Sequence, residues 1–198
     1  WLALSKIADN PYKEALQSLA DGLGIRPQGA SFLHLEMSTI FLLRSVDRYL
    51  QDDAVVGCVV PETVLNGHQH HLFRAGAYAE SDRPVSLSVE EIWKVDERAF
   101  KNRAAVLFGK KISPRNLDPI PGCFIAQDGS KELIDFHRVT LGPRMVWTDR
   151  NAIDAASLFH PADFEQGADI MPRRLFFHEV NGTDVPRMVA LAPIEQGA

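Results

Sequence analysis

One segment, Ala54–Lys111, constrains the fold more than any other part of the chain. It opens with a short, valine-rich apolar run, Ala54–Val60, which Pro61 ends. Short apolar runs between turn residues are typical of strands that are buried on both faces of a sheet. A proline-free stretch that is compatible with a helix follows, and the segment closes with two further β-rich runs, Val85–Val95 and Ala104–Lys110.

The order of these runs predicts an α/β fold. A polar bend at Lys101-Asn102 separates the last two runs and is short enough for a hairpin. We therefore expect a central strand over Ala54–Val60, then a helix, then Val85–Val95 and Ala104–Lys110 as an antiparallel edge hairpin beside the central strand.

Two helices are predicted before this segment. Asp9 can cap a helix that Pro11 opens and that covers Tyr12–Leu23. Ser31 can cap a longer helix that ends at about Leu50. The longer helix carries a broad apolar face, which is suited to packing on a sheet.

The character of the chain changes after residue 112. Residues 113–122 contain three prolines and one glycine, a composition typical of a linker. Residues 123–198 hold β-leaning pieces, such as Phe136–Leu141, and a turn at Asn181-Gly182. We therefore expect a folded unit over residues 1–112, a linker over 113–122 and a β-leaning region over 123–198.

Charge gives a mixed signal about partners. The 198 residues are 45% hydrophobic and 24% charged, which suits one or two small domains, and the net charge of −5 excludes a global basic field for nucleic acid. Between Trp93 and Ile112, however, basic residues exceed acidic ones by four, because six of the former face two of the latter. Either a solvated hairpin or a surface facing phosphates would explain this excess. The basic residues are Lys94, Arg98, Lys101, Arg103, Lys110 and Lys111.

The cysteines and the apolar runs bear on the compartment. Cys58 and Cys123 are too few and too far apart for a disulfide framework or a zinc site, so we expect a reducing cytoplasm. No run approaches 18 apolar residues, and no membrane partner is expected. The chain does not begin with Met, and we expect it to be a fragment of a longer protein.

Three histidines, His68, His70 and His71, invite a metal hypothesis. His68 and His71 would lie on one helix face, but no further Cys, His or carboxylate follows at the spacing that zinc sites show. We therefore interpret them as polar residues at the start of a helix and predict no metal site.

Several motifs in the same region, taken in order and spacing, resemble a known family. They are V-P-E-T-V-L at Val60–Leu65, L-F-R at Leu72–Arg74, and D-E-R-A-F-K-N-R-A-A-V-L-F-G-K-K at Asp96–Lys111. Together they resemble the second half of the gamma-type DNA amino-methyltransferases, which methylate the exocyclic amine of adenine. The resemblance covers Trp1–Lys111 and implies the second half of a Rossmann-like sheet.

The N-terminus fits the same family. Members carry Asn/Asp/Ser-Pro-Pro-aromatic after their fourth strand, and Trp1 matches the aromatic position, which implies that the target adenine stacks on it. Asn10-Pro11-Tyr12 has one proline and opens a helix, so it is not this tetrapeptide.

The resemblance also implies contacts with double-stranded DNA. A second aromatic before the last strand packs on the flipped base, and by position this is Phe100, although a hairpin core residue would show the same pattern. We expect basic side chains nearby to contact phosphates. These are Arg74, Arg98, Lys101 and Arg103.

The methyl donor implied by the resemblance is S-adenosylmethionine. Its glycine-rich loop and its acidic ribose-binding residue belong to the family's first half, and this sequence does not supply them. Gly22-Leu23-Gly24 is followed by a proline-containing loop instead of a helix, so it lacks the context of a nucleotide loop. We therefore expect the chain to bind the cofactor negligibly and to act together with an upstream half of the same polypeptide.

Two further interpretations stay open. F-E-Q-G-A-D-I-M-P-R-R-L-F-F at Phe164–Phe177 resembles the start of a DNA-recognition segment in restriction–modification proteins, which implies a restriction or specificity subunit as partner. The alternative function is a non-catalytic α/β scaffold that contacts DNA or protein. An unrelated α/β enzyme comes third, because no Gly-x-Ser-x-Gly motif or P-loop is present.

Overall fold

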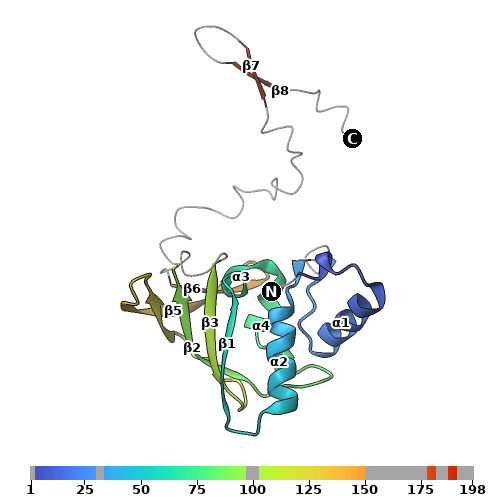
Figure 1. Cartoon of the computed structure of the whole chain (residues 1–198), viewed down its shortest axis with the longest axis vertical. Coiled ribbons are helices and arrows are strands. Elements are labelled where there is room, and N and C mark those ends of the chain that lie inside the picture. The colour runs from blue at the N-terminus through green and yellow to red at the C-terminus, as the bar shows by residue number, and fades with distance from the viewer. Residues whose placement is uncertain (1–2, 30–33, 97–102, 150–177, 182–186, 191–198) are drawn as a thin grey trace. The chain divides into compact units, whose positions relative to one another are not determined.

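A six-stranded mixed sheet of order β1-β3-β2-β4-β5-β6 forms the centre of a mixed α/β fold (Figure 1). The chain divides into two compact units, Trp1–Ala152, which holds this sheet, and Ile153–Ala198. The second unit contains an antiparallel pair, β7 (His178–Asn181) and β8 (Arg187–Ala190). The computed structural model describes residues 3–29, 34–96, 103–149, 178–181 and 187–190.

In the first unit, the two longer helices come before all the strands, and most of the short helical turns lie between the first strand and the second. The strands are β1 (Val55–Pro61), β2 (Ser88–Val95), β3 (Ala104–Lys110), β4 (Ile120–Ile125), β5 (Lys131–Leu141) and β6 (Arg144–Thr148). The longer helices are α1 (Asn10–Gly22) and α2 (Met37–Tyr49). Short helical turns are η1 (Leu4–Lys6), α3 (Thr63–Asn66), η3 (His68–His70), α4 (His71–Arg74) and η4 (Ala77–Ala79).

The β-rich runs of the sequence form the predicted antiparallel pair. β2 and β3 pair from Ser88↔Lys110 to Val95↔Ala104, with one register shift between Val89 and Glu91. The prediction of two antiparallel strands is thus confirmed, but the pair lies inside the described sheet instead of at its edge, because β2 also pairs with β4. β3 also pairs antiparallel with β1, so it lies between two strands that run parallel to each other.

The first strand has a different environment from the one that the sequence predicted. β1 is a strand, but it lies at one end of the described sheet instead of at the centre. Its side chains are correspondingly open, with Val55 73% and Val59 45% exposed. A valine-rich run fits a strand in either position, and the local pattern does not specify the number of neighbouring strands.

Both helices predicted before β1 are present in the fold, whereas the helix predicted after β1 is divided into the short turns α3, η3, α4 and η4. α1 begins at Asn10, and the side chain of Asp9 accepts a hydrogen bond from Tyr12 N at 3.1 Å, as expected for a capping residue. α2 begins at Met37, and the predicted cap Ser31 lies outside the described residues. At the other end of α2, Lys111 Nζ donates to the carbonyl of Leu50 at 2.8 Å and so satisfies one of the terminal acceptors of the helix.

The segment predicted to be a linker leads directly into the same sheet. Residues 113–119 connect β3 to β4, and β4 pairs parallel with β2, from Ile92↔Gly122 to Val95↔Ile125. The compact unit therefore continues past residue 122 to Ala152. Pro121 is tolerated near the start of β4 because proline is destabilising chiefly where a strand needs the missing N–H.

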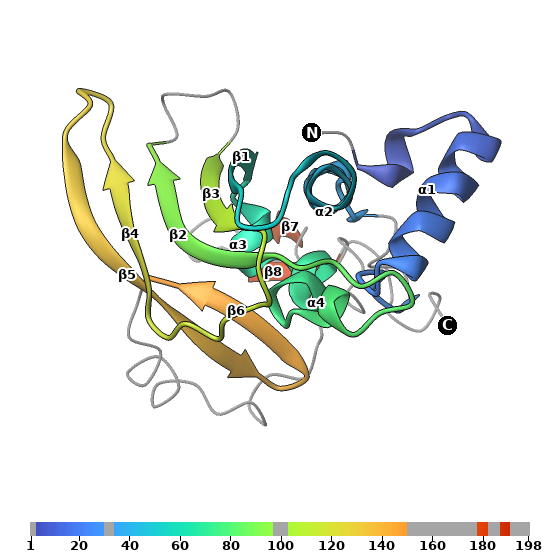
Figure 2. The same ribbon diagram turned by 90° about the horizontal axis from the view of Figure 1, so that it is seen from below.

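The sheet curves so that its last strands approach the short helices. Figure 2 shows β5 and β6 turning beneath α4, and α3 and α4 both contact β6. The aromatic rings of Phe73 in α4 and Trp147 in β6 meet edge to face at 6.0 Å, and both residues are buried. No helix in the described ranges combines the length and apolar character needed to cross a membrane.

Candidate functional site

The carboxyl ends of three strands meet at one edge of the sheet. β1 and β2 are each antiparallel to β3, and β4 is parallel to β2, so all three end on the same side. In open α/β sheets, ligands bind outside the carboxyl ends of the strands. We take this edge, called the carboxyl edge below, as the candidate site.

An ion-pair cluster joins the strands at the carboxyl edge. Lys94 Nζ, near the end of β2, lies 3.3 Å from Glu62 Oε1 and 3.1 Å from Asp149 Oδ2. Glu62 follows β1, and its main-chain N donates to the carbonyl of Arg103 at 3.1 Å. Two carboxylates therefore compensate the charge of Lys94.

A hydrogen-bond network leads from the interior to the carboxyl edge. Glu36 Oε2 accepts from Thr63 Oγ1 at 2.6 Å, and it lies 3.2 Å from His70 Nε2. On the other side of the ring, His70 Nδ1 lies 3.3 Å from Thr39 Oγ1. Thr39 and His70 are fully buried, whereas Thr63 is exposed at the start of α3. The network thus fixes the loop after β1 against the start of α2.

The protonation states in this network follow from burial and hydrogen bonding. Burial lowers the pKa of His70 below its ordinary value, against the opposing effect of Glu36. Burial raises the pKa of Glu36, but the hydrogen bonds from His70 and Thr63 outweigh burial and leave it below its usual value. His70 is therefore a neutral imidazole that donates from Nε2 to the Glu36 carboxylate and accepts from Thr39 at Nδ1.

This network can position groups, but it is poorly placed to react. His70 has no exposed surface, so it cannot touch a substrate in this arrangement. Glu36 also pairs through its backbone with Ala3 as an isolated bridge, and Leu4 N donates to Leu35 O at 3.0 Å. The residues that follow the N-terminus are therefore held at the carboxyl edge by the start of α2.

The sequence did not single out this network. His70 was grouped with His68 and His71, which stack with ring centroids 5.4 Å apart. His70 is 34 residues from its partner Glu36, and Glu36 is 27 residues from its second partner, Thr63. The one available signal was the position of Thr63 shortly after a strand, behind Glu62, where polar residues reach the carboxyl edge.

Most of the predicted DNA-contacting residues lie outside the described residues. These are Trp1, Arg98, Phe100 and Lys101. Their flanks are described: Asp96 N donates to Ile125 O at 2.9 Å, and Arg103 is exposed where β3 begins. The segment that connects β2 to β3 therefore leaves and re-enters the sheet at the carboxyl edge.

Arg74 has a different role from the one predicted. Its side chain is buried, and its guanidinium donates to the carbonyls of Met145 (2.6 Å), Val64 (2.7 Å) and Gly67 (2.8 Å). All three acceptors are neutral main-chain groups, so Arg74 joins α3 and α4 to β6. The prediction that Arg74 contacts a phosphate is not supported by this geometry, because the group is enclosed.

The basic excess of the hairpin is divided between the two ends of β3. Lys94 and Arg103 lie at the carboxyl edge, whereas Lys110 pairs with Asp53 at 2.8 Å at the far end of the strand. A strand of this length spans about 20 Å. The excess of positive charge along the sequence is therefore not one continuous surface in the described residues.

The described residues do not fit S-adenosylmethionine or a metal ion on their own. The loop after β1 contains Glu62 and no glycine, and Gly22 and Gly24 lie at the end of α1 instead of between a strand and a helix. Among the described residues, no group of three or more His, Cys, Asp or Glu side chains could hold a metal ion.

Comparison of the sequence with known proteins adds no family assignment: no family model matches the chain, and no curated protein matches it.

Proposed function

We propose that the chain is the substrate-facing half of a DNA adenine amino-methyltransferase. The observation that carries the proposal is the insertion of β3, antiparallel, between the parallel strands β1 and β2. This arrangement supports the resemblance, which implied a strand, a helix and an antiparallel hairpin in this order. It also brings the ends of the segment that contains Phe100 to the edge where β1 ends.

The carboxyl edge supplies a frame for the proposed substrate contacts. The bridge between Ala3 and Glu36 anchors the segment that begins with Trp1, and β2 and β3 anchor the segment that contains Phe100. An adenine that is methylated must leave the duplex, and aromatic side chains can then hold its flat ring. In this proposal Trp1 and Phe100 stack on the base, and Arg103 faces a phosphate.

In this proposal the cofactor is held by residues outside the described part of the chain. S-adenosylmethionine would supply the methyl group that the exocyclic amine of adenine receives. β1 is the end strand of the described sheet, so a further strand could pair with it. The exposure of Val55 in β1, 73%, also supports this arrangement. The partner of the complete enzyme is double-stranded DNA in the cytoplasm.

The test is methylation of DNA by the complete gene product. We would incubate it with S-adenosylmethionine and DNA that carries no methylated adenine, digest the DNA and search for N6-methyladenine by mass spectrometry. The proposal expects N6-methyladenine and no methylcytosine. DNA that binds to the protein but gains no methyl group would contradict the proposal and favour the scaffold interpretation.

A further inference from the structure

The sheet of the first unit turns one face toward the core and carries a row of apolar side chains on the other. Residues that pair directly across neighbouring strands place their side chains on the same face, so the strand registers define the row. On the opposite face, Ile92 and Leu107 are buried in the core. We call the row, which crosses β1, β3, β2, β4 and β5, the apolar row. Its members are Val59, Val106, Trp93, Cys123 and Leu133.

The apolar row is partly open to solvent. Its end members Leu133 and Val59 are 88% and 45% exposed, and Val55, on the same face of β1, is 73% exposed. Trp93 is half-buried, and its ring centroid lies 4.6 Å from that of Phe108. A sheet face that water covers normally carries polar residues. A contiguous apolar surface of this kind is typical of an interaction site.

Two charges of opposite sign flank the apolar row on β5. Lys131 and Asp135 each stand two residues from Leu133, so all three side chains lie on one face. The Nζ atom of Lys131 lies 4.4 Å from the centre of the Trp93 ring, as this direction requires. Asp135 is exposed, and its carboxylate has no ion-pair partner in the part of the chain that the structure describes.

This pattern is complementary to itself. Rotating a second copy by a half-turn about an axis along the apolar row lays the two sheets face to face, with each member of the row opposite its counterpart. The rotation also reverses the strand direction, so Lys131 of each copy faces Asp135 of the other. A symmetric dimer requires such a self-complementary patch, and packed sheets commonly align their strands. We propose that two copies of this chain associate through the apolar row in a symmetric dimer with two ion pairs between Lys131 and Asp135.

Charge and size distinguish a second copy from other partners. Near the apolar row, the basic residues that the described registers place on this face are Lys110 and Lys131. Lys110 already pairs with Asp53 at 2.8 Å, and Glu91 adds negative charge, so nucleic acid is disfavoured. Five strands about 4.8 Å apart and about 20 Å long present roughly 400 Å² per copy, about half of what a standard interface buries on each side. We therefore expect a weak dimer that exchanges with the monomer.

Sedimentation equilibrium of the 198-residue chain measures this association. Over concentrations from about 5 to 500 µM, we expect the average mass to rise from that of a monomer toward that of a dimer. Leu133→Asp should abolish the rise. Because Leu133 is exposed, this variant should keep its fold, which circular dichroism checks. The inference does not rest on the proposed methyl transfer, since it uses none of the residues assigned to that reaction.

Charge reversal tests the orientation of the two copies. Asp135→Lys places two cations opposite each other in each pair and should weaken association at least tenfold. Lys131→Asp should have a similar effect, and the two substitutions together restore opposite charges and should recover most of the association. Glu132→Lys is the matched control, because it reverses an exposed charge on the same strand but on the other face, and should change association less than threefold.

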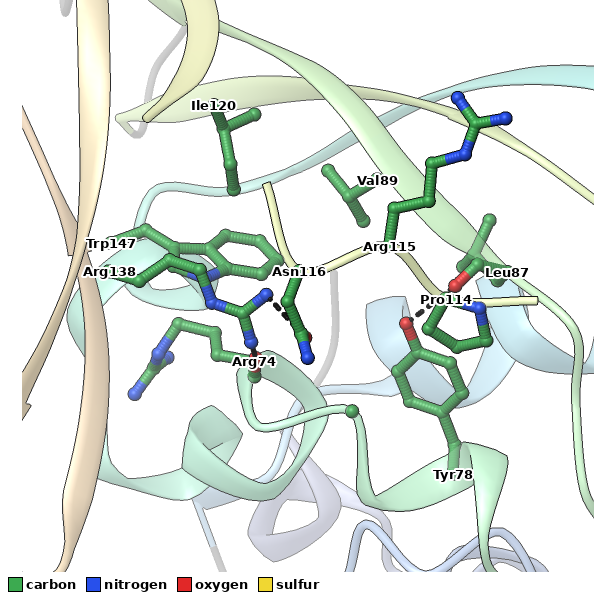
Figure 3. Close-up of a pocket in the computed structure, with 11 residues that line it drawn as sticks. Arg74, Tyr78, Leu87, Val89, Pro114, Arg115, Asn116, Ile120, Arg138 and Trp147 are labelled. Atoms are coloured by element: carbon green, nitrogen blue, oxygen red, sulfur yellow. Dashed lines mark hydrogen bonds between the residues drawn. The ribbon is translucent and has the colours of Figure 1, made fainter. Parts of the chain in front are cut away.

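The tryptophans report which face becomes buried. In ¹⁵N–¹H correlation spectra, the indole signal of Trp93 should shift as the concentration rises. The signal of Trp147 should stay in place, because this residue packs against Phe73 on the other face and lines a small pocket with Ile120 (Figure 3). A mass that stays monomeric over the whole range would overturn the proposal, as would a dimer that Leu133→Asp and Asp135→Lys leave unchanged.

Discussion

The Nε2 atom of His70 lies 3.2 Å from the Oε2 atom of Glu36, so a buried histidine and a half-buried carboxylate share one hydrogen bond. His70 belongs to a short helical turn after β1, and Glu36 stands directly before α2. The pair therefore connects the two segments that flank the carboxyl edge. Both pKa values lie below their ordinary values, which favours a neutral ring and an ionised carboxylate.

This pair makes stability depend on pH in a defined direction. The folded state resists protonation of His70, whereas the unfolded chain takes up a proton below about 6.5, the ordinary value. The free energy of unfolding should therefore fall as pH decreases below about 6.5. It should fall further below about pH 4.5, because Glu36 takes up its proton at a higher pH in the unfolded chain than in the folded chain. Urea unfolding from pH 8 to pH 4 measures this decline.

The histidine variants identify the source of the decline. His70→Gln should be less stable at pH 8 but should lose less stability between pH 7 and pH 5 than the parent chain. His68→Gln is the matched control, because burial also lowers the pKa of His68 although its ring is more exposed. A His70→Gln profile with the parental slope would show that another group is responsible.

The hydroxyl of Thr63 should stabilise the loop after β1. Thr63→Val keeps the shape of the side chain but removes the donor to Glu36, and hydrogen bonds to charged groups contribute about 1.5–3 kcal/mol. We expect a loss of about 1–2 kcal/mol, because Thr63 is exposed and water can replace part of the bond. Thr63→Ser, which keeps the hydroxyl, should lose less than half as much. Equal losses in both variants would exclude the hydrogen bond as the cause.

Local patterns predicted the strands, but they could not predict which residues meet. β2 and β3 follow from alternation and one polar bend, and both are found where the sequence indicated. The contacts of Glu36 with Thr63 and His70 depend on chain segments that are brought together only by the fold. Prolines in residues 113–122 suggested a linker, yet Ile120 begins a strand whose partner, β2, lies about 30 residues earlier.

Arg74 shows that the polarity of a residue does not by itself predict whether its side chain is exposed. Arginine is mostly exposed in proteins, and the sequence around Arg74 gives no sign that three main-chain carbonyls will surround it. Val64 lies within α3 and Gly67 directly follows it, and short helical turns leave main-chain acceptors that a further donor can reach. The structural role of Arg74 therefore arises from the shortness of α3, which the prediction of one continuous helix did not include.

Removing this guanidinium should be among the most damaging single changes in the first unit. Arg74→Met keeps much of the apolar stem but removes the guanidinium donor from three main-chain carbonyls, of which that of Gly67 keeps its hydrogen bond from His70 N. Each buried acceptor that is left without a donor costs about 1–3 kcal/mol. We expect a loss of at least about 3 kcal/mol in urea unfolding. Arg74→Lys, which restores charge and some donors, should recover part of it. A stable Arg74→Met protein would show that water satisfies these carbonyls.

Gly122 should tolerate no side chain. A Cβ atom at this position would collide with the carbonyl oxygen of Ile92 in the neighbouring strand and with the ring of Phe136. Because the first of these contacts is main chain, β2 and β4 would have to separate, and we expect Gly122→Ala to lower the Tm by more than 10 °C or to prevent folding. Gly129→Ala is the control, since nothing lies within 4 Å of its Cβ and only its φ of +82° is unfavourable. Equal Tm values for the two variants would contradict the pairing of β2 with β4.

The proposed methyl transfer predicts distinct effects for Phe100 and Arg103 in the complete gene product. Phe100→Ala removes one aromatic surface from the flipped base, and base stacking is worth about 1–3 kcal/mol, so methyl transfer should fall roughly ten- to a hundredfold. Arg103→Ala, at the exposed start of β3, should weaken DNA binding for all sequences and reduce its salt dependence, since phosphate contacts carry no base code. Steady-state methylation and binding titrations at several salt concentrations measure the two effects separately.

Thermal unfolding of the same Phe100→Ala protein separates stacking from a structural role. A phenylalanine in a core costs about 3–5 kcal/mol when it is replaced by alanine, whereas one that lines an open site costs much less. A variant that melts close to the parent but methylates slowly supports the stacking role. A variant that melts far below the parent identifies Phe100 as a hairpin core residue. A variant that is stable and methylates at the parental rate removes Phe100 from the proposed site, because neither the packing of its side chain nor its ring would then matter to the reaction.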